Sequence, residues 1–287
     1  MGSRRDRRAR SITRLALIAA LVLVAACEPQ PDESAALAHD WPARPASASE
    51  AQLVTVLDGD SLRVAVGSHN VEIRLAGINA PERDECHGDA ARLALRDLAS
   101  ETVWIEVIDT DQFGRSVAGV WSEAGFVNGI VVARGGAIAM TDHAPWAAQL
   151  IAAESTARQH GVGMWSLDAC GEPVTARVSL EMTSPDPPGP DDQVLNEEIV
   201  TIVNTGSRDL DLSGFVLRDE SSVNRLRFPE GTVLPARTSL AVVTGCSPAA
   251  GFAWCAAGPI WNNAGDSAIL LSPAGTVVAH VRYAPPG

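Results

Sequence analysis

The chain has 287 residues, with 22 basic and 35 acidic side chains and a formal charge of −13 at pH 7. Every base is an arginine, because the sequence contains no lysine. Hydrophobic residues make up 46% of the chain and charged residues 20%, which excludes wholesale disorder and a multi-span membrane protein. The length suits one large domain or two ordinary ones, and the acidity argues against a simple electrostatic nucleic-acid binder.

The first 26 residues have the pattern of an export signal. Six arginines fall within the first fourteen residues, and the apolar run from Leu15 to Ala26 is too short for a stable membrane span. The run ends in Val-Ala-Ala-Cys27, which resembles the bacterial lipobox and implies a lipid on Cys27 that anchors the protein to the cell surface or the outer face of a membrane. An ordinary secretory signal with a chance cysteine is the alternative. Removal of residues 1–26 leaves 16 bases and 34 acids, a formal charge of −18.

Residues 27–50 are rich in Pro, Ala and Ser without periodicity, which predicts a flexible tether. A first domain is then expected over residues 51–170. Its predicted strands are 53–57, 61–66, 71–78, 103–108 and 116–121. Asp89 is expected to cap a helix that buries Ala91, Ala94, Leu95 and Leu98, and further helices are expected over 126–134 and 146–160. Five strands with interspersed helices predict a small barrel of the OB type.

After Cys170 the helical patterns stop, and strand runs such as EIVTIV, SLAVVT and VVAHVRY alternate with turn residues. This pattern predicts a β-sandwich over residues 174–285. The Pro-rich segment 184–192 looks like an interdomain linker by composition, but strand patterns flank it, so it is interpreted as a loop inside the second domain. The expected fold class is mainly β, an α+β OB-fold barrel followed by an all-β, immunoglobulin-like sandwich.

Three short motifs of the first domain carry the chemistry. They are Asp58-Gly-Asp60, Arg74-Leu-Ala-Gly-Ile-Asn79-Ala80-Pro-Glu82 and Asp111-Gln-Phe113-Gly-Arg115. Each alone is a common turn or helix-start signal. Their order and spacing together resemble the staphylococcal-nuclease-like (thermonuclease) family, and the similarity runs from about Val54 to Ser166.

This resemblance implies an OB-fold enzyme that cleaves the phosphodiester bonds of DNA and RNA with Ca²⁺. It implies that Glu82 activates the attacking water, while Arg74 and Arg115 bind the phosphate and stabilise its transition state. Asp60 and the carbonyl of Ala80 would hold calcium.

The residue types suit that chemistry on physical grounds. In-line attack on a phosphodiester needs a base for water, positive groups on the phosphate oxygens and often a metal. Arginine suits the phosphate role because its planar fork donates two parallel hydrogen bonds and stays charged at every relevant pH.

Two departures from the family pattern weaken the expected site. Asn79 stands where the family usually has an aspartate ligand, so calcium binding is predicted to be weak. Phe113 replaces a common tyrosine, which leaves stacking on the substrate but loses the phenolic hydrogen bond. Residues 51–169 contain 8 arginines and 16 acids, so tight binding of nucleic acid is not expected.

Four cysteines remain after Cys27, two in each domain, an even number in a chain predicted to be exported. We expect the disulfides Cys86–Cys170 and Cys246–Cys255, with free or metal-bound thiols as the alternative. No cysteine or histidine spacing indicates a zinc site.

The second domain resembles the lamin-tail family through three segments, 198–206, 211–219 and 263–278. The resemblance implies an immunoglobulin-like fold and is nearly silent on function. We interpret the domain as a binding or spacing module of unknown ligand, and we expect the whole chain to be a monomer.

Two functions remain open. The first is a lipid-anchored, calcium-dependent nuclease acting on DNA, RNA or both. The second is a non-catalytic surface lipoprotein that binds a polymer or a partner through its two modules. Joint retention of Arg74, Glu82, Arg115 and Asp60 favours the nuclease, because a binding module needs no carboxylate base between two arginines.

Overall fold

The computed structural model describes residues 39–141, 144–221 and 223–284. Residues 31–287 form one compact unit of the chain. The predicted signal peptide and the lipidation site Cys27 lie outside the described residues, and both stay predictions.

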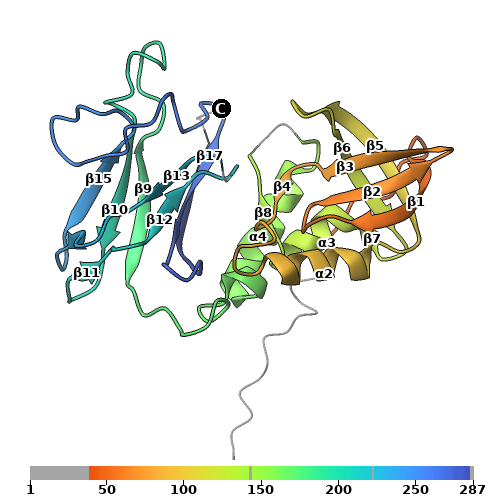
Figure 1. The fold of residues 1–287 in the computed structure, drawn as a ribbon, viewed down its shortest axis with the longest axis horizontal. Helices are drawn as coiled ribbons and strands as arrows, with labels where there is room; N and C mark the ends of the chain where they lie inside the picture. The colour runs from red at the N-terminus through yellow and green to blue at the C-terminus, as the bar shows by residue number, and fades with distance from the viewer. Residues whose placement is uncertain (1–38, 142–143, 222, 285–287) are drawn as a thin grey trace, which may run out of the picture. The chain divides into compact units, whose positions relative to one another are not determined.

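The first half of this unit is a closed five-stranded barrel (Figure 1). Its strands are β1 (Ser49–Val56), β2 (Ser61–Val66), β3 (His69–Leu75), β5 (Thr102–Thr110) and β6 (Ser116–Ser122), and the short β7 (Gly125–Phe126) extends the sheet beyond β6. The order β3-β2-β1-β5-β6 is antiparallel, and a parallel pairing of β3 with β6 closes the circle. The expected OB-type barrel is confirmed.

Helices pack on the barrel and fill its opening. They are α2 (Gly88–Leu98), α3 (Val127–Ala133), α4 (Ala147–His160) and the 3₁₀ turn η1 (Gly163–Trp165). A two-stranded ladder of β4 (Ile78–Asn79) and β8 (Ile138–Ala139) joins the end of β3 to the segment after α3. None of the described helices has the length and apolarity needed to cross a membrane.

Helix α2 begins differently from the prediction. Ala91, Leu95 and Leu98 are buried as expected, but the residue before the helix is His87, and Asp89 lies inside the first turn. The reason is steric: a Cβ at Gly88 would lie 1.8 Å from the carbonyl oxygen of Glu82, so only glycine allows the chain to turn into the helix there. The capping role predicted for Asp89 is therefore wrong.

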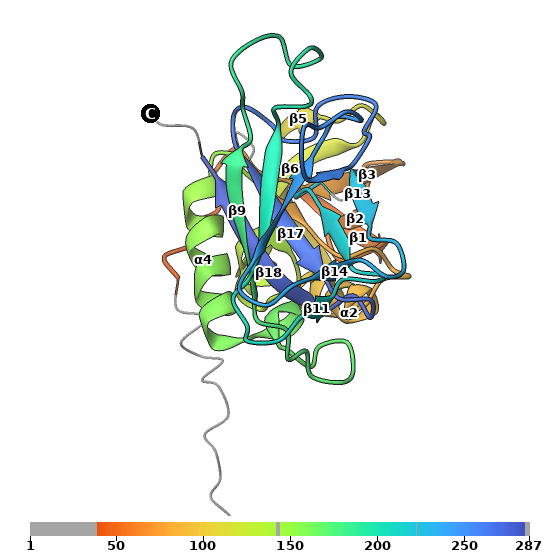
Figure 2. The same ribbon diagram turned by 90° about the vertical axis from the view of Figure 1, so that its left-hand side faces the viewer.

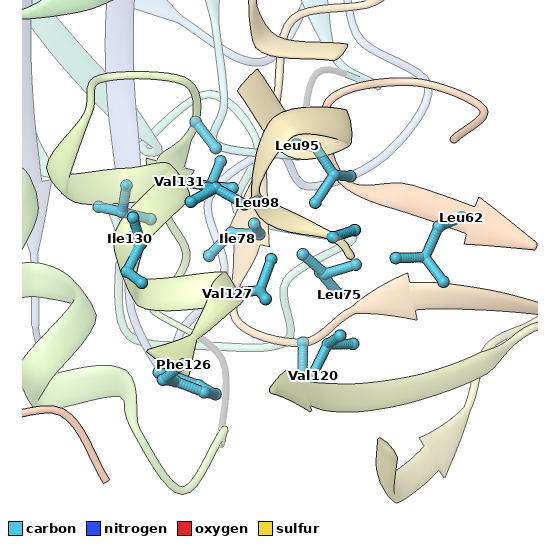
Figure 3. Packing of buried hydrophobic residues seen from close by; sticks show 14 of the residues in the cluster. Leu62, Leu75, Ile78, Leu95, Leu98, Val120, Phe126, Val127, Ile130 and Val131 are labelled. Atoms are coloured by element: carbon cyan, nitrogen blue, oxygen red, sulfur yellow. The ribbon is translucent and has the colours of Figure 1, made fainter. Parts of the chain in front are cut away.

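The core of the barrel is a continuous apolar cluster (Figure 3). Leu62, Leu75 and Val120 reach it from the strands, and Leu95 and Val127 reach it from the helices. Trp121 is buried, with its ring centre 5.0 Å from the ring centre of Phe126. Helices and strands thus share a single core, as expected for one domain.

The flexible tether predicted for residues 27–50 is wrong for its last ten residues. Trp41 packs on the barrel core, because Gly129 of α3 leaves room for its ring. The indole of Trp121 donates to the carbonyl of Pro42 at 3.0 Å, and the Arg44 guanidinium lies 4.1 Å from the ring centre of Trp104. Trp41 and Pro42, which stand in an otherwise polar, Ala-rich stretch, were the features of the sequence that could have indicated this packing.

The second half consists of two facing β-sheets, which Figure 2 shows from the side. One sheet has the order β16-β15-β10-β9, from β9 (Val178–Ser184), β10 (Ile199–Asn204), β15 (Ser239–Val243) and β16 (Phe252–Ala253). The other has the order β13-β12-β17-β18, from β12 (Val216–Arg218), β13 (Arg225–Arg227), β17 (Asp266–Leu271) and β18 (Val277–Tyr283). The short strands β11 (Leu210–Asp211) and β14 (Val233–Leu234) pair separately.

The predicted sandwich is confirmed, and an apolar cluster that includes Val200, Leu217 and Leu270 fills it. Strand β9 pairs with β10, so the Pro-rich segment between them connects neighbouring strands of one sheet, as the flanking patterns indicated.

One of the two predicted disulfides is confirmed. Cys86 and Cys170 are bonded, at a sequence separation of 84. Cys246 and Cys255 are exposed free thiols, so the second predicted bridge is wrong for this structure. Hydrogen bonds from Trp254 and Ala256 to the backbone of Val243 and Thr244 already shape the loop that carries Cys255, so its closure needs no covalent bond.

A buried asparagine ties the closure of the barrel to a helix. Asn128 of α3 is fully buried; its side-chain oxygen accepts from the backbone of Val120, and its amide donates to the carbonyls of Ala76 and Ala118. These bonds attach α3 to backbone groups next to the β3–β6 pairing, where the backbone N–H of Ala76 also donates to the carbonyl of Ala118.

We expect Asn128→Ala to destabilise the protein by about 3 kcal/mol, because buried donors and acceptors lose their partners. Chemical denaturation followed by far-UV circular dichroism measures this loss. The control is Asn70→Ala, at an exposed position, with an expected change within about 0.5 kcal/mol. Equal midpoints for the two variants would contradict the assignment.

Candidate active site

The turn between β1 and β2 presents a buried carboxylate to the end of β3. The side chain of Asp58 accepts the backbone N–H of Asp60 at 3.0 Å, which shapes the turn. Gly59 is needed between them, because a Cβ there would lie 2.6 Å from Cβ of Ala80 and 2.7 Å from Cβ of Ala91. The Asp-Gly-Asp motif thus serves close packing as well as chemistry.

Asp60 accepts three donors inside this turn. Its Oδ2 accepts the backbone N–H of Ala80 at 2.6 Å and lies 3.3 Å from Nη2 of Arg74, and its Oδ1 accepts the hydroxyl of Ser61. Burial raises the pKa of Asp60 to about 6, against the opposing effect of the Arg74 charge. The carboxylate therefore depends on Arg74 to stay ionised in its buried position.

Arg74 lies at the end of β3, with its side chain largely buried. Its Nη1 donates to the carbonyl of Leu75 and its Nη2 to Oδ1 of Asn79, each at 3.0 Å. The guanidinium is thereby held in one orientation, which suits a group that must meet a phosphate without rearranging.

Glu82 lies on the exposed rim of the same region. It lines an open depression of about 410 Å³ with Asp58, Arg83, Asp84 and Asp89. Partial burial raises the pKa of Glu82, and the charges of Asp58 and Glu85 raise it further, while Arg74 lowers it. The structure therefore brings Glu82, Arg74 and Asp60 into one electrostatic neighbourhood, as the motifs predicted.

Arg115 and Phe113 lie on the hairpin between β5 and β6. The side chain of Asp111 accepts the backbone N–H groups of both and binds Nε of Arg115 at 2.7 Å. Arg74 pairs with Val117 in the parallel ladder, and Arg115 lies two residues before Val117, so alternation places it on the same face of the sheet as Arg74. Phe113 is 74% exposed, with the Arg115 guanidinium 5.6 Å from its ring centre, as a stacking platform requires.

The side chains of Asp60 and Asn79, two of the three predicted calcium ligands, are bonded to other groups of the protein. Oδ1 of Asn79 accepts from Arg74, its amide donates to the carbonyl of Glu220, and Ala80 turns its N–H toward Asp60. Asp60 is the one charged member, and Arg74 already lies against it. Within residues 39–141, 144–221 and 223–284, no group of three or more His, Cys, Asp or Glu is placed to hold a metal ion.

Sequence reasoning missed the residues that shape the site. Asp58 and Asp111 belong to the motifs, but the motifs did not predict that these side chains accept backbone N–H groups. Glu85 was missed entirely; its Oε2 accepts the backbone N–H of Glu82 at 3.0 Å. The signal was present, since an acidic side chain three residues after the start of a turn commonly caps that turn.

The fold and the site define a class of protein: an OB-fold barrel in which an arginine at the end of β3 lies against a buried carboxylate, with an exposed glutamate within reach of the charge of that arginine. Comparison with known families agrees. Residues 72–167 match the model described as staphylococcal nuclease homologue, and residues 172–285 match the lamin tail domain.

Three relatives share the first of these regions. A protein named micrococcal nuclease from Shigella flexneri is 32% identical over 133 residues, covering 42% of this chain and 76% of the relative. Protein ParB from Escherichia coli is 34% identical over 152 residues, covering 49% and 86%. A protein named uncharacterized endonuclease from Escherichia coli O157:H7 is 30% identical over 116 residues, covering 40% and 76%. The chain belongs to the staphylococcal nuclease homologue family and carries a lamin tail domain after it.

The electrostatics of Glu82 can be measured directly. We expect its carboxyl group to titrate above the ordinary value of 4.5, so that it loses its proton at a higher pH than an isolated glutamate does. Carboxyl-detected NMR follows this titration. Asp58→Asn keeps the oxygen that accepts from Asp60 but removes a charge, and should lower the pKa of Glu82. A pKa at or below 4.5 in the unmodified protein would contradict the described environment.

Proposed function

We propose that this protein is a nuclease that hydrolyses the phosphodiester bonds of DNA, RNA or both. The observation that carries the proposal is the placement of Glu82 within electrostatic reach of Arg74, whose charge lowers its pKa, with Arg115 two residues before Val117, the partner of Arg74 in the parallel ladder. Family membership and relatives with nuclease and endonuclease in their names support it.

The hydrolysis step can be described with residues of this chain. The Glu82 carboxylate takes a proton from water as the water oxygen bonds to phosphorus, and the bond from phosphorus to the leaving oxygen breaks. Arg74 and Arg115 donate to the phosphate oxygens, where negative charge accumulates in the transition state. The raised pKa of Glu82 makes its carboxylate a better proton acceptor than that of an ordinary glutamate.

The proposed nuclease is expected to have a low affinity for its substrate. Twice as many acids as arginines occur in residues 51–169, so nucleic acid meets repulsion before it meets the two arginines. We infer an enzyme that binds its substrate loosely and in a salt-sensitive way, while placed guanidinium groups supply the catalysis.

Calcium has a limited place in the proposal. The family generally uses Ca²⁺, and this chain offers Asp60 as the one charged member of the expected ligand set. A single carboxylate that an arginine already contacts binds calcium weakly, in the range of about 10⁻⁴ to 10⁻³ M found in extracellular calcium modules.

We also propose that the enzyme works outside the cytoplasm, held by lipid on Cys27. The lipobox-like run before Cys27 and the confirmed Cys86–Cys170 disulfide support export, since disulfides persist in oxidising compartments.

The nuclease proposal is tested with the fragment 28–287 on single-stranded DNA and RNA. Glu82→Gln should lower the release of acid-soluble nucleotides by about 10² to 10⁴, the usual range for loss of a general base. Glu123→Gln, at an exposed position of the same domain, is the matched control and should keep the full rate. Equal slow release by the unmodified fragment and Glu82→Gln would favour the non-catalytic binding lipoprotein instead.

A calcium titration of the same activity tests the metal. We expect half-maximal activation at about 10⁻⁴ to 10⁻³ M, because one charged ligand holds the ion loosely. Asp60→Asn should abolish the response. Saturation at low micromolar calcium would show a tighter site than these residues provide.

Membrane fractionation of cells expressing the full chain tests the anchor. Cys27→Ser should move the protein from the membrane fraction to the soluble exported fraction, because the lipid is the proposed attachment. Unchanged retention on membranes would refute lipidation at Cys27.

A further inference from the structure

The lamin tail domain contacts the loop that carries Glu82. Arg225 on β13 forms an ion pair with Glu85, and the side chains of both residues are largely shielded from solvent. A Cβ at Gly275 would lie 2.9 Å from Cβ of Cys86, so the turn before β18 packs on the disulfide. A cavity of about 220 Å³ separates the rest of the loop, from Pro81 to His87, from the arginines of β12 and β13.

Glu85 links Arg225 to the main chain of Glu82. Its Oε1 faces Arg225, and its Oε2 accepts the backbone N–H of Glu82 at 3.0 Å. The backbone N–H of Glu85 in turn donates to the carbonyl of Glu82 at 2.9 Å. One carboxylate therefore joins a strand of the second domain to the main chain of the proposed general base.

A second contact reaches Arg74. The amide of Asn79 donates to the backbone carbonyl of Glu220 at 3.0 Å, while its oxygen accepts from Arg74. Asn79 and Glu220 are both buried, so these bonds are shielded from water. An aspartate at position 79 has no N–H to offer the carbonyl of Glu220, which gives a structural reason for asparagine where the family pattern has an acid.

Glu220 is itself firmly placed. Its Oε1 accepts both the backbone N–H and the hydroxyl of Thr141, each at 2.7 Å, and its Oε2 accepts the hydroxyl of Ser267. The turn after β12 is thus bonded to the segment after β8 as well as to its own sheet. It can hold Asn79 without shifting.

Apolar packing and a buried ion pair support both contacts. Ile138, Met164 and Trp165 of the first domain form one buried cluster with Ile269 and Val277 of the second. Close by, Arg282 of β18 binds the fully buried Glu154 of α4 at 3.0 Å and the carbonyl of Ala139 at 2.8 Å. The two domains are therefore packed as parts of one core and do not behave as a tethered pair.

We propose that the lamin tail domain is a working part of the nuclease site because it positions two of the three proposed catalytic groups, Glu82 and Arg74. Arg225 holds the backbone of Glu82 through Glu85, and Glu220 holds Arg74 through Asn79. Asn79, Glu85 and Arg225 are positioning residues that do not touch the substrate. The catalytic roles of Glu82 and Arg74 rest on the proposed function, whereas the contacts themselves do not.

Steady-state kinetics on fragment 28–287 separates positioning from substrate binding. Arg225→Gln should lower kcat between about 10- and 100-fold, the cost of a slightly misplaced catalytic group, with KM changed less than about twofold. Arg225→Lys should recover part of kcat, because it keeps the charge beside Glu85. Arg208→Gln removes an exposed arginine elsewhere in the same domain and is the matched control, with unchanged kinetics.

A double-mutant cycle tests the route through Glu85. Arg225→Gln combined with Glu85→Gln should cost no more than the worse single change, because the two residues act in series. Additive losses would overturn the route. A raised KM with unchanged kcat in Arg225→Gln would also overturn it and would assign Arg225 to direct contact with nucleic acid.

Asn79→Asp tests the second contact. As a positioning residue, Asn79 cannot be replaced by aspartate without loss, so kcat at saturating calcium should fall at least about tenfold. A higher or unchanged kcat would overturn this contact and return Asn79 to the calcium set.

Hydrogen exchange gives a readout that does not depend on activity. The peptide containing Glu82 should exchange faster in Arg225→Gln than in the unmodified fragment, because the Glu82 amide loses a fixed acceptor. Arg208→Gln should match the unmodified fragment. An inactive but normally folded wild-type fragment would refute the nuclease proposal alone, whereas unchanged exchange would refute the positioning contact alone.

Discussion

The structure around the site depends on one buried carboxylate. Asp60 accepts the backbone N–H of Ala80 and lies against Arg74, so it joins the β1–β2 turn, the end of β3 and the segment leading to Glu82. Burial raises the pKa of Asp60 to about 6, and the Arg74 charge opposes this rise by favouring the ionised carboxylate. Arg74, which is proposed to bind phosphate, is thus also the counterion of the buried Asp60 carboxylate.

Because Arg74 balances a buried charge and is also proposed to bind phosphate, its guanidinium is held firmly in one place. A guanidinium that must offset a buried carboxylate is bonded on several sides, here also to Asn79 and to the carbonyl of Leu75. The same bonds use side-chain oxygens of Asp60 and Asn79, two members of the expected calcium ligand set, in agreement with the weak calcium binding proposed above. In the proposed nuclease, a few arginines in fixed places would supply the positive charge that a general positive surface supplies in other nucleic-acid enzymes.

Local patterns predicted much of the architecture. Alternating apolar residues in β2 and β3, and the stripe of Ala91, Leu95 and Leu98 in α2, are set by the burial of one face and need no distant information. The motif residues Asp60, Arg74 and Glu82 come together because they lie at the ends of elements that the barrel brings to one edge. The start of α2 was misjudged, since Gly88 responds to the carbonyl of Glu82, a contact made only when the turn has folded.

The sequence by itself determined the two fold classes, because periodicity and turn residues are local properties. Motif spacing and composition also predicted the residues of the site and a signal for export. Only the tertiary structure decided how Asn79, Glu85 and Arg225 are used. Their partners lie up to 141 residues away in the chain, and a hydrogen bond between an amide and a distant backbone carbonyl leaves no mark on the residues next to either group. The packing of Trp41 on the barrel core also depends on distant segments of the chain. The same holds for Cys246 and Cys255, which are free thiols in the folded structure.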